Sequence, residues 1–272
     1  MTDDPRAHPF RDSVQDVAIA DRIPDTAQTR APSYRLAFAD PEFLTRDELR
    51  PVRLQLELLK PQMAMDAYGV VSTIVLFGGA RIPAVAGPGT TPAMAALVPY
   101  YEEARRFARL VTARSLTMPA REDVIVTGGG PGVMEAGNLG ASEAGGVSIG
   151  LSIVLPHEQA PNAHVTPDLC FNFHYFAIRK MHFLMRARAI CVFPGGFGTL
   201  DEMFESLTLI QTGRMKRIPF LLFGRDWWER IIDWQALAQA GVIAGRDLDL
   251  FAFVETAEEA IAIIDNWPHH SP

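Results

Sequence analysis

After Gly69, short apolar runs alternate with amphipathic segments, and this alternation restricts the possible folds more than any other feature. The runs are rich in β-branched residues, as is typical of parallel strands covered on both faces. They occupy residues 72–79, 123–130, 146–155, 188–196 and 217–224. Helices are expected at residues 94–115, 132–144, 174–187, 199–212 and 226–240. With right-handed crossovers, this order predicts an α/β fold with a doubly wound, mainly parallel sheet of the Rossmann-like kind.

The chain before this region has a different pattern. Residues 1–34 contain prolines, mixed charges and little apolar periodicity, which predicts a mobile tail. Residues 35–69 carry helical spacing interrupted by Pro51 and Pro61, so we expect one or two helices as an N-terminal extension. Residues 70–268 then form the Rossmann-like domain.

Composition excludes several classes of protein. With 272 residues, of which 48% are hydrophobic, the chain can bury a large core. A formal charge of −7 argues against a nucleic-acid surface, and no apolar run is long enough to span a membrane. The acidic N-terminus with its prolines does not resemble a secretory signal. Cys170 and Cys191 lie in apolar surroundings without metal-ligand spacing, so we expect reduced core thiols in a cytoplasmic protein.

Three of the five predicted strands end in consecutive glycines. These are Gly78-Gly79, Gly128-Gly129-Gly130 and Gly195-Gly196. Each group stands where a strand gives way to a helix, at the carboxyl edge of the sheet, where ligands bind in such folds. Glycine lets a ligand approach the backbone closely. Three such turns on one edge therefore predict a ligand site.

The common nucleotide and metal motifs are absent from the sequence. There is no GxxxxGK[ST] and no GxGxxG, which argues against a P-loop ATPase and a dinucleotide oxidoreductase. No HExxH or CxxC occurs either, so we expect neither a metal nor a cofactor. What remains is GGFGT (195–199) at a helix start, where backbone N–H groups and the helix dipole can hold a phosphate. Alternatively, Thr199 is an N-cap and Glu202 its capping-box partner.

Positive charge precedes this turn. Between Leu169 and Leu200 there is no Asp or Glu, whereas Arg179, Lys180, Arg186 and Arg188 all lie inside. One interpretation is a solvated basic face on a surface helix. The other, which we favour because the stretch leads into the glycine turn, is an electropositive pocket in an otherwise acidic protein.

Three separated blocks resemble the LONELY GUY family of phosphoribohydrolases. They are GGGPGVMEAGNLGA (128–141), FHYFAIRKMHFLMRARA (173–189) and FPGGFGTLDEMFESLTLIQTG (193–213). The family signature is PGGxGTxxE with an Arg-Lys pair on the preceding helix. The likeness extends from about Arg50 to Trp228 and is closest to the longer bacterial branch. At the first turn, Gly78 to Arg81, the family more usually carries serines.

The resemblance implies an activity. Family members hydrolyse the N-glycosidic bond of AMP or of N6-substituted adenosine 5′-monophosphates (cytokinin nucleotides), giving free base and ribose 5-phosphate. Such sequences are often labelled lysine decarboxylases, but nothing here marks a Schiff-base lysine with a pyridoxal-phosphate site. The family also implies a purine nucleotide as the small-molecule partner and a homodimer or higher homo-oligomer.

The family's functional residues can be carried over by position. Catalysis is assigned to Arg179 and Glu202, with Glu202 reaching the ribose and Arg179 keeping it ionised. The resemblance assigns the 5′-phosphate to Gly195, Gly196, Gly198 and Thr199, and the nucleotide cleft to Gly129, Gly130, Met134 and Lys180. The alternative from another class is a nucleotide-binding sensor or carrier without turnover.

Overall fold

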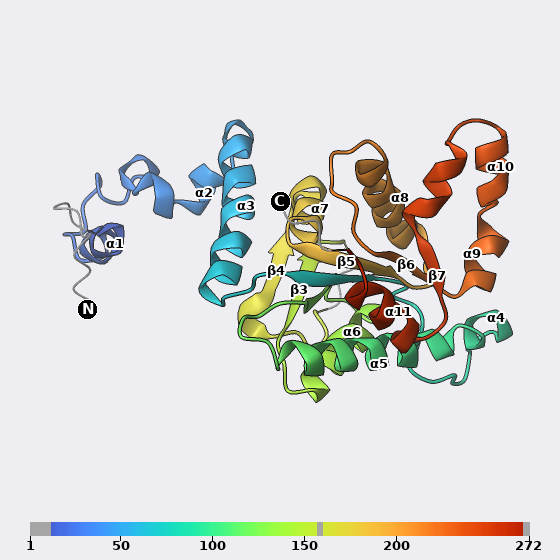
Figure 1. Ribbon diagram of the computed structural model, residues 1–272. Coiled ribbons are helices and arrows are strands. Elements are labelled where there is room, and N and C mark those ends of the chain that lie inside the picture. Colours follow the sequence, from blue (N-terminus) through green and yellow to red (C-terminus); the bar gives the residue numbers. More distant parts are fainter. Residues whose placement is uncertain (1–11, 157–159, 269–272) are drawn as a thin grey trace. The chain divides into compact units, whose positions relative to one another are not determined.

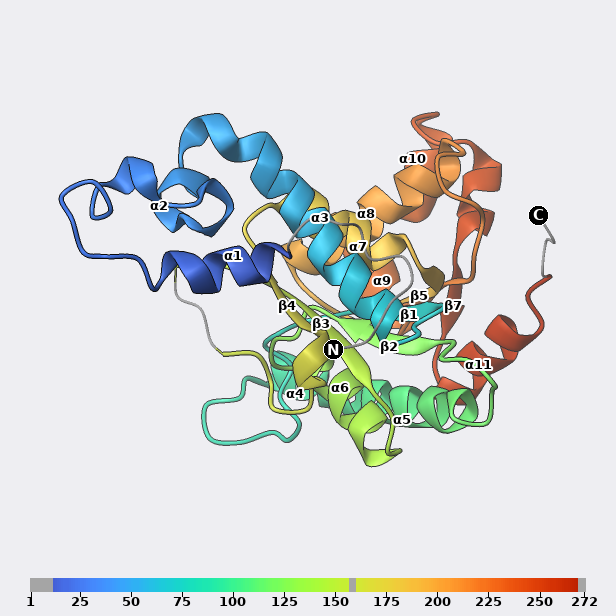
Figure 2. The same ribbon diagram turned by 90° about the vertical axis from the view of Figure 1, so that its left-hand side faces the viewer.

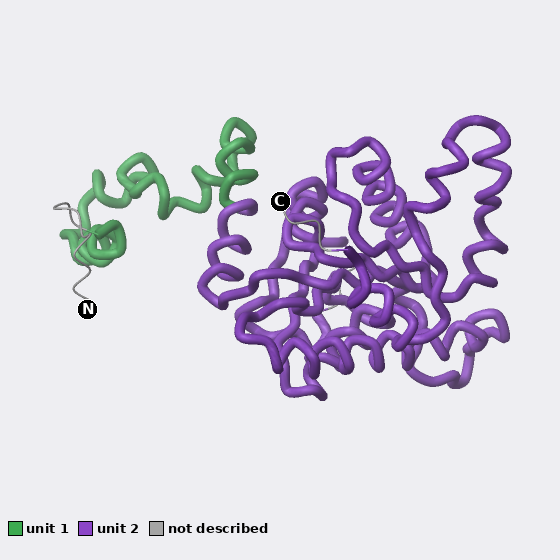
Figure 3. Tube along the Cα trace, in the orientation of Figure 1, with its two compact units in different colours: residues 1–56 green, residues 57–272 purple. Residues whose placement is uncertain are grey.

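The computed structural model describes residues 12–156 and 160–268. Contacts along the chain divide it into two units, residues 1–56 and 57–272 (Figure 3). The helix α3 (Arg50–Ala67) runs through the boundary between them. The first eleven residues of the predicted tail lie outside the described residues, and the domain limits predicted from the sequence stay a prediction.

The first unit consists of short helical segments. Its α-helices are α1 (Ser13–Ala20) and α2 (Pro41–Leu44), followed by the start of α3, and its 3-10 turns are η1 (Pro32–Tyr34), η2 (Ala37–Ala39) and η3 (Asp47–Leu49). Asp12 and Asp40 cap α1 and α2 by accepting backbone N–H groups. Residues 13–20 of the predicted tail are therefore helical.

Pro61 lies inside α3 and is buried, so the predicted interruption at this residue is wrong. A proline has no N–H, and the carbonyl four residues earlier, that of Glu57, loses its helical donor. Nε2 of the buried His182 donates to that carbonyl at 3.1 Å. A tertiary hydrogen bond thus replaces the missing helical one, which a local sequence pattern does not reveal.

Seven parallel strands form one sheet in the second unit. They are β1 (Thr73–Phe77), β2 (Val124–Thr127), β3 (Ser148–Ile153), β4 (Cys170–Phe173), β5 (Ala187–Val192), β6 (Phe220–Phe223) and β7 (Ala252–Val254). Their order is β4-β3-β2-β1-β5-β6-β7. The chain runs outward from β1 to β4, then returns to place β5 beside β1 and continues to β7. The predicted doubly wound parallel sheet is confirmed.

Helices cover both faces of this sheet (Figures 1 and 2). One face packs against α5 (Val98–Ser115), α6 (Val133–Glu143) and α11 (Ala257–Asp265), and the other against α7 (Phe176–Leu184), α8 (Phe197–Gln211), α9 (Arg225–Ile231) and α10 (Trp234–Gln239). The remaining segments are α4 (Pro92–Ala95), η4 (Pro167–Leu169) and η5 (Gly245–Leu250). Along β1, Ile74 and Leu76 face the first layer, and Val75 and Phe77 the second, as a period of two requires.

The edge strands β4 and β7 were not predicted. In β4 the exposed Asn172 interrupts the apolar run, and β7 has only three residues, two of them partly exposed, so neither gives the pattern of a strand buried on both faces. Cys170 lies in β4 and is partly exposed, whereas Cys191 in β5 is buried, so only Cys191 is a core thiol. The helix expected at 226–240 is divided into α9 and α10. Within the described residues, no helix has the length and apolar content to cross a membrane.

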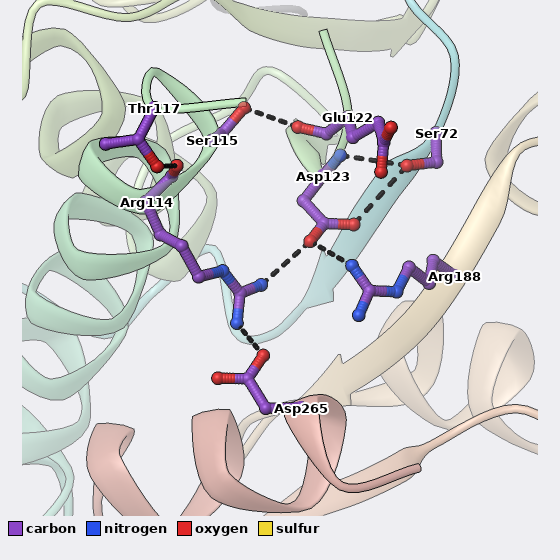
Figure 4. Close-up of polar contacts among 8 residues, drawn as sticks. All are labelled: Ser72, Arg114, Ser115, Thr117, Glu122, Asp123, Arg188 and Asp265. Carbon is purple, nitrogen blue, oxygen red and sulfur yellow. Dashed lines mark hydrogen bonds and ion pairs between the residues drawn. The ribbon is translucent and has the colours of Figure 1, made fainter. Parts of the chain in front are cut away.

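A buried carboxylate joins several elements at the amino end of the strands (Figure 4). Asp123 is fully buried and has a left-handed backbone, with φ of 57°. It accepts hydrogen bonds from Arg114 on α5 at 2.8 Å and from Arg188 on β5 at 2.5 Å. Arg114 also pairs with Asp265 of α11. Two arginines balance one buried charge here, at the edge of the sheet opposite the glycine turns.

Candidate active site

The three glycine turns meet at the carboxyl edge of the sheet. They follow β1, β2 and β5, which are neighbours in the order β2-β1-β5. The N–H of Gly79 donates to the carbonyl of Pro194 at 2.9 Å, and the N–H of Val133 donates to the carbonyl of Gly79 at 3.2 Å. The sheet reverses its winding between β1 and β5, and such a switch point is where open α/β sheets bind ligands. The predicted common edge is confirmed.

The turn after β5 leads straight into α8. The helix begins at Phe197 with Gly196 as N-cap, and no side chain caps its first turn. Gly196 and Gly198 have open space where a side chain would stand, and Phe197 is 92% exposed. The free N–H groups of this turn can therefore bind an anion.

The capping-box interpretation of Thr199 and Glu202 is wrong. Thr199 is inside the helix and buried against Gly195, where an added Cβ would lie 2.6 Å from the Cβ of Thr199. Since α8 starts at Phe197, Glu202 is not in its first turn. Its carboxylate is thus not engaged in capping and is available for another role.

Glu202 is buried at the start of α8, with 7% of its surface exposed. Burial raises the pKa of its carboxyl from 4.5 to about 7, against the opposing effects of Lys180 and Arg179. Arg179 favours the ionised form of Glu202, as expected, but burial outweighs this effect and the carboxyl is not held ionised. The Nη1 of Arg179 is 3.8 Å from Oε1 of Glu202, too far for a tight ion pair to offset desolvation. At neutral pH, Glu202 is divided between its two protonation states, as suits a general base.

Arg179 is held between three elements. It projects from α7, and its Nε–H donates to the carbonyl of Leu151 in β3 at 2.7 Å. Its guanidinium lies over the ring of Phe183, 5.1 Å from the centroid. An added Cβ on Gly128 would lie 2.8 Å from its Nη2, so the guanidinium also contacts the turn after β2. Arg179 therefore brings together the second glycine turn and Glu202.

The turn after β2 is supported by two side-chain amides, those of the buried Asn138 and the half-buried Asn162. Gly129, with φ of 72°, donates its N–H to Thr127 Oγ1, which in turn donates to Asn138 of α6 at 2.7 Å. The side-chain amide of Asn162 donates to the carbonyls of Gly129 and Gly130, both at 3.0 Å. Sequence reasoning missed both asparagines. Asn138 was detectable as a polar residue on a buried helix face, but nothing local to Asn162 indicates its role.

Met134 belongs to the same corner of the site. Added Cβ atoms on Gly128 and Gly130 would lie 2.7 Å from its Sδ and 2.8 Å from its Cε, so its side chain lies directly over the turn. Its placement beside Gly130 is compatible with the predicted nucleotide cleft, which stays a prediction. The structure thus brings together Met134, the glycine turns, Arg179 and Glu202.

The predicted electropositive pocket is wrong. Lys180 pairs with two carboxylates of α8, Arg186 with Asp66, and Arg188 with Asp123. These partners are distant in sequence, so a local absence of acids did not indicate a local excess of positive charge. Across residues 12–156 and 160–268, no three His, Cys, Asp or Glu side chains converge on a possible metal position.

Part of the chain matches a protein-family model. Residues 134–264 match the family model described as possible lysine decarboxylase. This range contains Met134, Arg179, Glu202 and the turn after β5, but not the first two glycine turns. A comparison with curated proteins gave no match.

Three solved structures have a similar fold and low sequence identity to this chain. The molybdenum cofactor binding protein from the phototrophic bacterium Rippkaea orientalis is 20% identical, with a TM-score of 0.46 over 71% of this chain and 95% of that chain. The Moco carrier protein from Chlamydomonas reinhardtii is 18% identical, with a TM-score of 0.45 over 71% of this chain and 95% of that chain. The structural-genomics target TM1055 is 23% identical, with a TM-score of 0.49 over 71% of this chain and 98% of that chain. Because no TM-score reaches 0.5, we draw no functional conclusion from them.

Proposed function

We propose that this protein is a nucleoside 5′-monophosphate glycosidase of the LONELY GUY family, which its sequence resembles. The match of residues 134–264 to the family model described as possible lysine decarboxylase supports this proposal. It hydrolyses the N-glycosidic bond of AMP or of N6-substituted adenosine 5′-monophosphates, releasing the base and ribose 5-phosphate. We place this activity in the cytoplasm. A homodimer is supported by apolar surface exposed on α7 and at the start of α8, at Phe176, Met181, Met185 and Phe197.

The 5′-phosphate binds the turn that starts α8. Its N–H groups have no side-chain cap, and Gly196 and Gly198 leave open space beside them. The helix dipole adds partial positive charge at the same end. Thr199 closes the turn from its buried side. Phosphate binding energy, remote from the reacting bond, then holds the ribose in position for catalysis.

Glu202 acts on the ribose and on water. Cleavage of the glycosidic bond leaves positive charge on the ribose ring, and the ionised carboxylate stabilises that charge. It also accepts a proton from the attacking water, whose oxygen forms the new bond to C1′ as the base departs with the bonding electrons. A pKa of about 7 lets Glu202 accept this proton near neutral pH.

Arg179 orients Glu202 and keeps the guanidinium fixed beside the turn after β2. Its hydrogen bond to Leu151 and its contact with Phe183 restrict the side chain before substrate arrives. Burial lowers the pKa of Arg179, but an arginine stays charged at neutral pH. A fixed charge of this kind requires little reorganisation in the transition state.

The observation that carries this proposal is the buried carboxyl of Glu202 beside an anion-binding turn. Burying it destabilises the folded protein at neutral pH, and a binding protein gains nothing from negative charge near a phosphate. A decarboxylase with a Schiff-base lysine is not supported. Lys60 and Lys216 are exposed, and Lys180, the third of the three lysines, is held protonated by two carboxylates.

The test is release of free base from a panel of substrates, followed by chromatography. AMP and an N6-prenylated AMP should be cleaved, with kcat/KM at least about a hundredfold above that for adenosine. Parallel samples contain EDTA, which should leave the rate unchanged, or L-lysine with pyridoxal phosphate, which should yield no carbon dioxide. Nucleotide binding without base release would instead support the sensor or carrier, and equal cleavage of AMP and adenosine would refute the phosphate assignment.

A further inference from the structure

Lys180 follows Arg179 on α7, but its side chain reaches a different place. Its Nζ is 2.8 Å from Oδ2 of Asp201 and 2.6 Å from Oε2 of Glu205, both on α8. The lysine side chain is only 15% exposed. Asp201 and Glu205 are four residues apart and so lie on one face of α8, and Glu202 directly follows Asp201. One ammonium thus joins α7 to α8 at the level of Glu202.

We propose that Lys180 is a positioning residue for Glu202 and not a ligand of the nucleotide. This proposal rests on the glycosidase function argued above. The two ion pairs fix α8 against α7, and they keep one positive charge next to the buried carboxylate while neutralising the acids on either side of it. A substrate phosphate would have to displace two carboxylates to reach Nζ, which removes Lys180 from the predicted nucleotide cleft.

The charges around Glu202 come from two helices. On α7, Lys180 and Arg179 favour the ionised carboxylate, and Lys180 has the larger effect. On α8, Asp201 and Glu205 oppose it. The segment η5 also packs on α8, but its Asp247 accepts a hydrogen bond from Gln211 at the far end of that helix. Lys180 therefore counteracts part of the effect of burial.

Two substitutions should move the ionisation of Glu202 in opposite directions. Lys180→Met removes a positive charge and leaves two acids unneutralised, so the pKa of Glu202 should rise by roughly one pH unit. Glu205→Gln removes a negative charge and keeps the lysine, so the pKa should fall. Lys216→Met is the matched control, because the same substitution is made at an exposed lysine.

The first readout is the pH profile of AMP hydrolysis. In Lys180→Met, the rise of kcat/KM with pH should move to higher pH, with a loss of about fivefold at pH 7 that recovers by pH 9. KM for AMP should stay within about twofold of wild type. In Glu205→Gln, the rise should move to lower pH. A large increase in KM for Lys180→Met without a shifted profile would show that Lys180 binds the substrate and would overturn the proposal.

The second readout needs no turnover. Glu202→Gln is introduced into wild type, Lys180→Met and Glu205→Gln, and the Tm of each protein is measured with and without it from pH 4 to 9. The pH dependence of each difference in Tm reports the pKa of Glu202 in that background. If AMP is not cleaved, the glycosidase function fails while this measurement still decides the role of Lys180. If the pKa of Glu202 is unchanged, or shifts in the same direction in Lys180→Met and Glu205→Gln, the proposed role of Lys180 is overturned. If Lys180→Met does not fold, two other variants decide the role of Lys180. Glu205→Gln should lower the pKa of Glu202, and the charge-preserving Lys180→Arg should leave that pKa near its wild-type value.

Discussion

Replacing Glu202 by Gln should make the protein more stable and nearly inactive. Gln has almost the same shape but cannot ionise, so the substitution removes only the cost of a buried charge. The rise in the pKa of Glu202 from 4.5 to about 7 corresponds to roughly 3 kcal/mol of unfolding free energy, at about 1.36 kcal/mol for each pH unit. The side chain is 10% exposed, so solvent screens this cost little.

The sign of the effect depends on pH. The folded-state pKa lies above the unfolded value, so the neutral carboxyl is favoured by folding. The contribution of Glu202 to wild-type stability is fully present below about pH 4.5 and is lost as pH rises through about 7. Glu202→Gln has no such loss. The stability of the variant relative to wild type should therefore increase between pH 5 and pH 8.

The assay is thermal unfolding of both proteins at pH 5 and pH 8. At roughly 2 to 4 °C for each kcal/mol, the Tm of the variant should gain on the order of 5 to 10 °C relative to wild type between the two pH values. Its kcat on AMP should fall by about a hundredfold or more. The control Glu48→Gln, at an exposed glutamate, should show no pH-dependent gain.

Two outcomes would refute this reasoning separately. An equal Tm difference at pH 5 and pH 8 would show that burial does not raise the pKa of Glu202. A kcat near that of wild type would show that the carboxylate is not catalytic, whatever its pKa. Higher stability combined with lost activity would identify Glu202 as a residue retained for function at the expense of stability.

Two further predictions concern the backbone and the opposite edge of the sheet. Gly195→Ala should lower Tm by several degrees, because its Cβ would lie 2.6 Å from the Cβ of Thr199, whereas Gly196→Ala, with open space, should keep Tm but weaken nucleotide binding in a calorimetric titration. Equal Tm for the two variants would contradict the packing argument. Asp123→Asn should cost about 3 to 5 kcal/mol in a urea unfolding experiment, since Asn tolerates the left-handed backbone but removes the charge partner of Arg188 and one of the two carboxylates that pair with Arg114. A loss below about 1 kcal/mol would show that this network contributes little.

The sequence alone predicts where the site lies. Apolar runs that end in glycine turns identify the strands, and the winding rules place those turns on one edge of a parallel sheet. This worked for the five central strands because each is covered on both faces and is therefore mostly apolar. It failed for the two edge strands. In β4 the exposed Asn172 interrupts the apolar run, and β7 has only three residues, two of them partly exposed.

Only the tertiary structure decides what the charged residues do. Thr199 and Glu202 have the spacing of a capping box, but packing of Thr199 against Gly195 places the helix start at Phe197. Lys180 lies in a stretch without acids, yet two carboxylates from the next helix neutralise it. Burial and charge pairing depend on distances in space, to which residues far apart in the chain contribute as strongly as neighbours. The ionisation of Glu202, and with it the proposed chemistry, is therefore set by its burial and by the ion pairs that join α7 to α8.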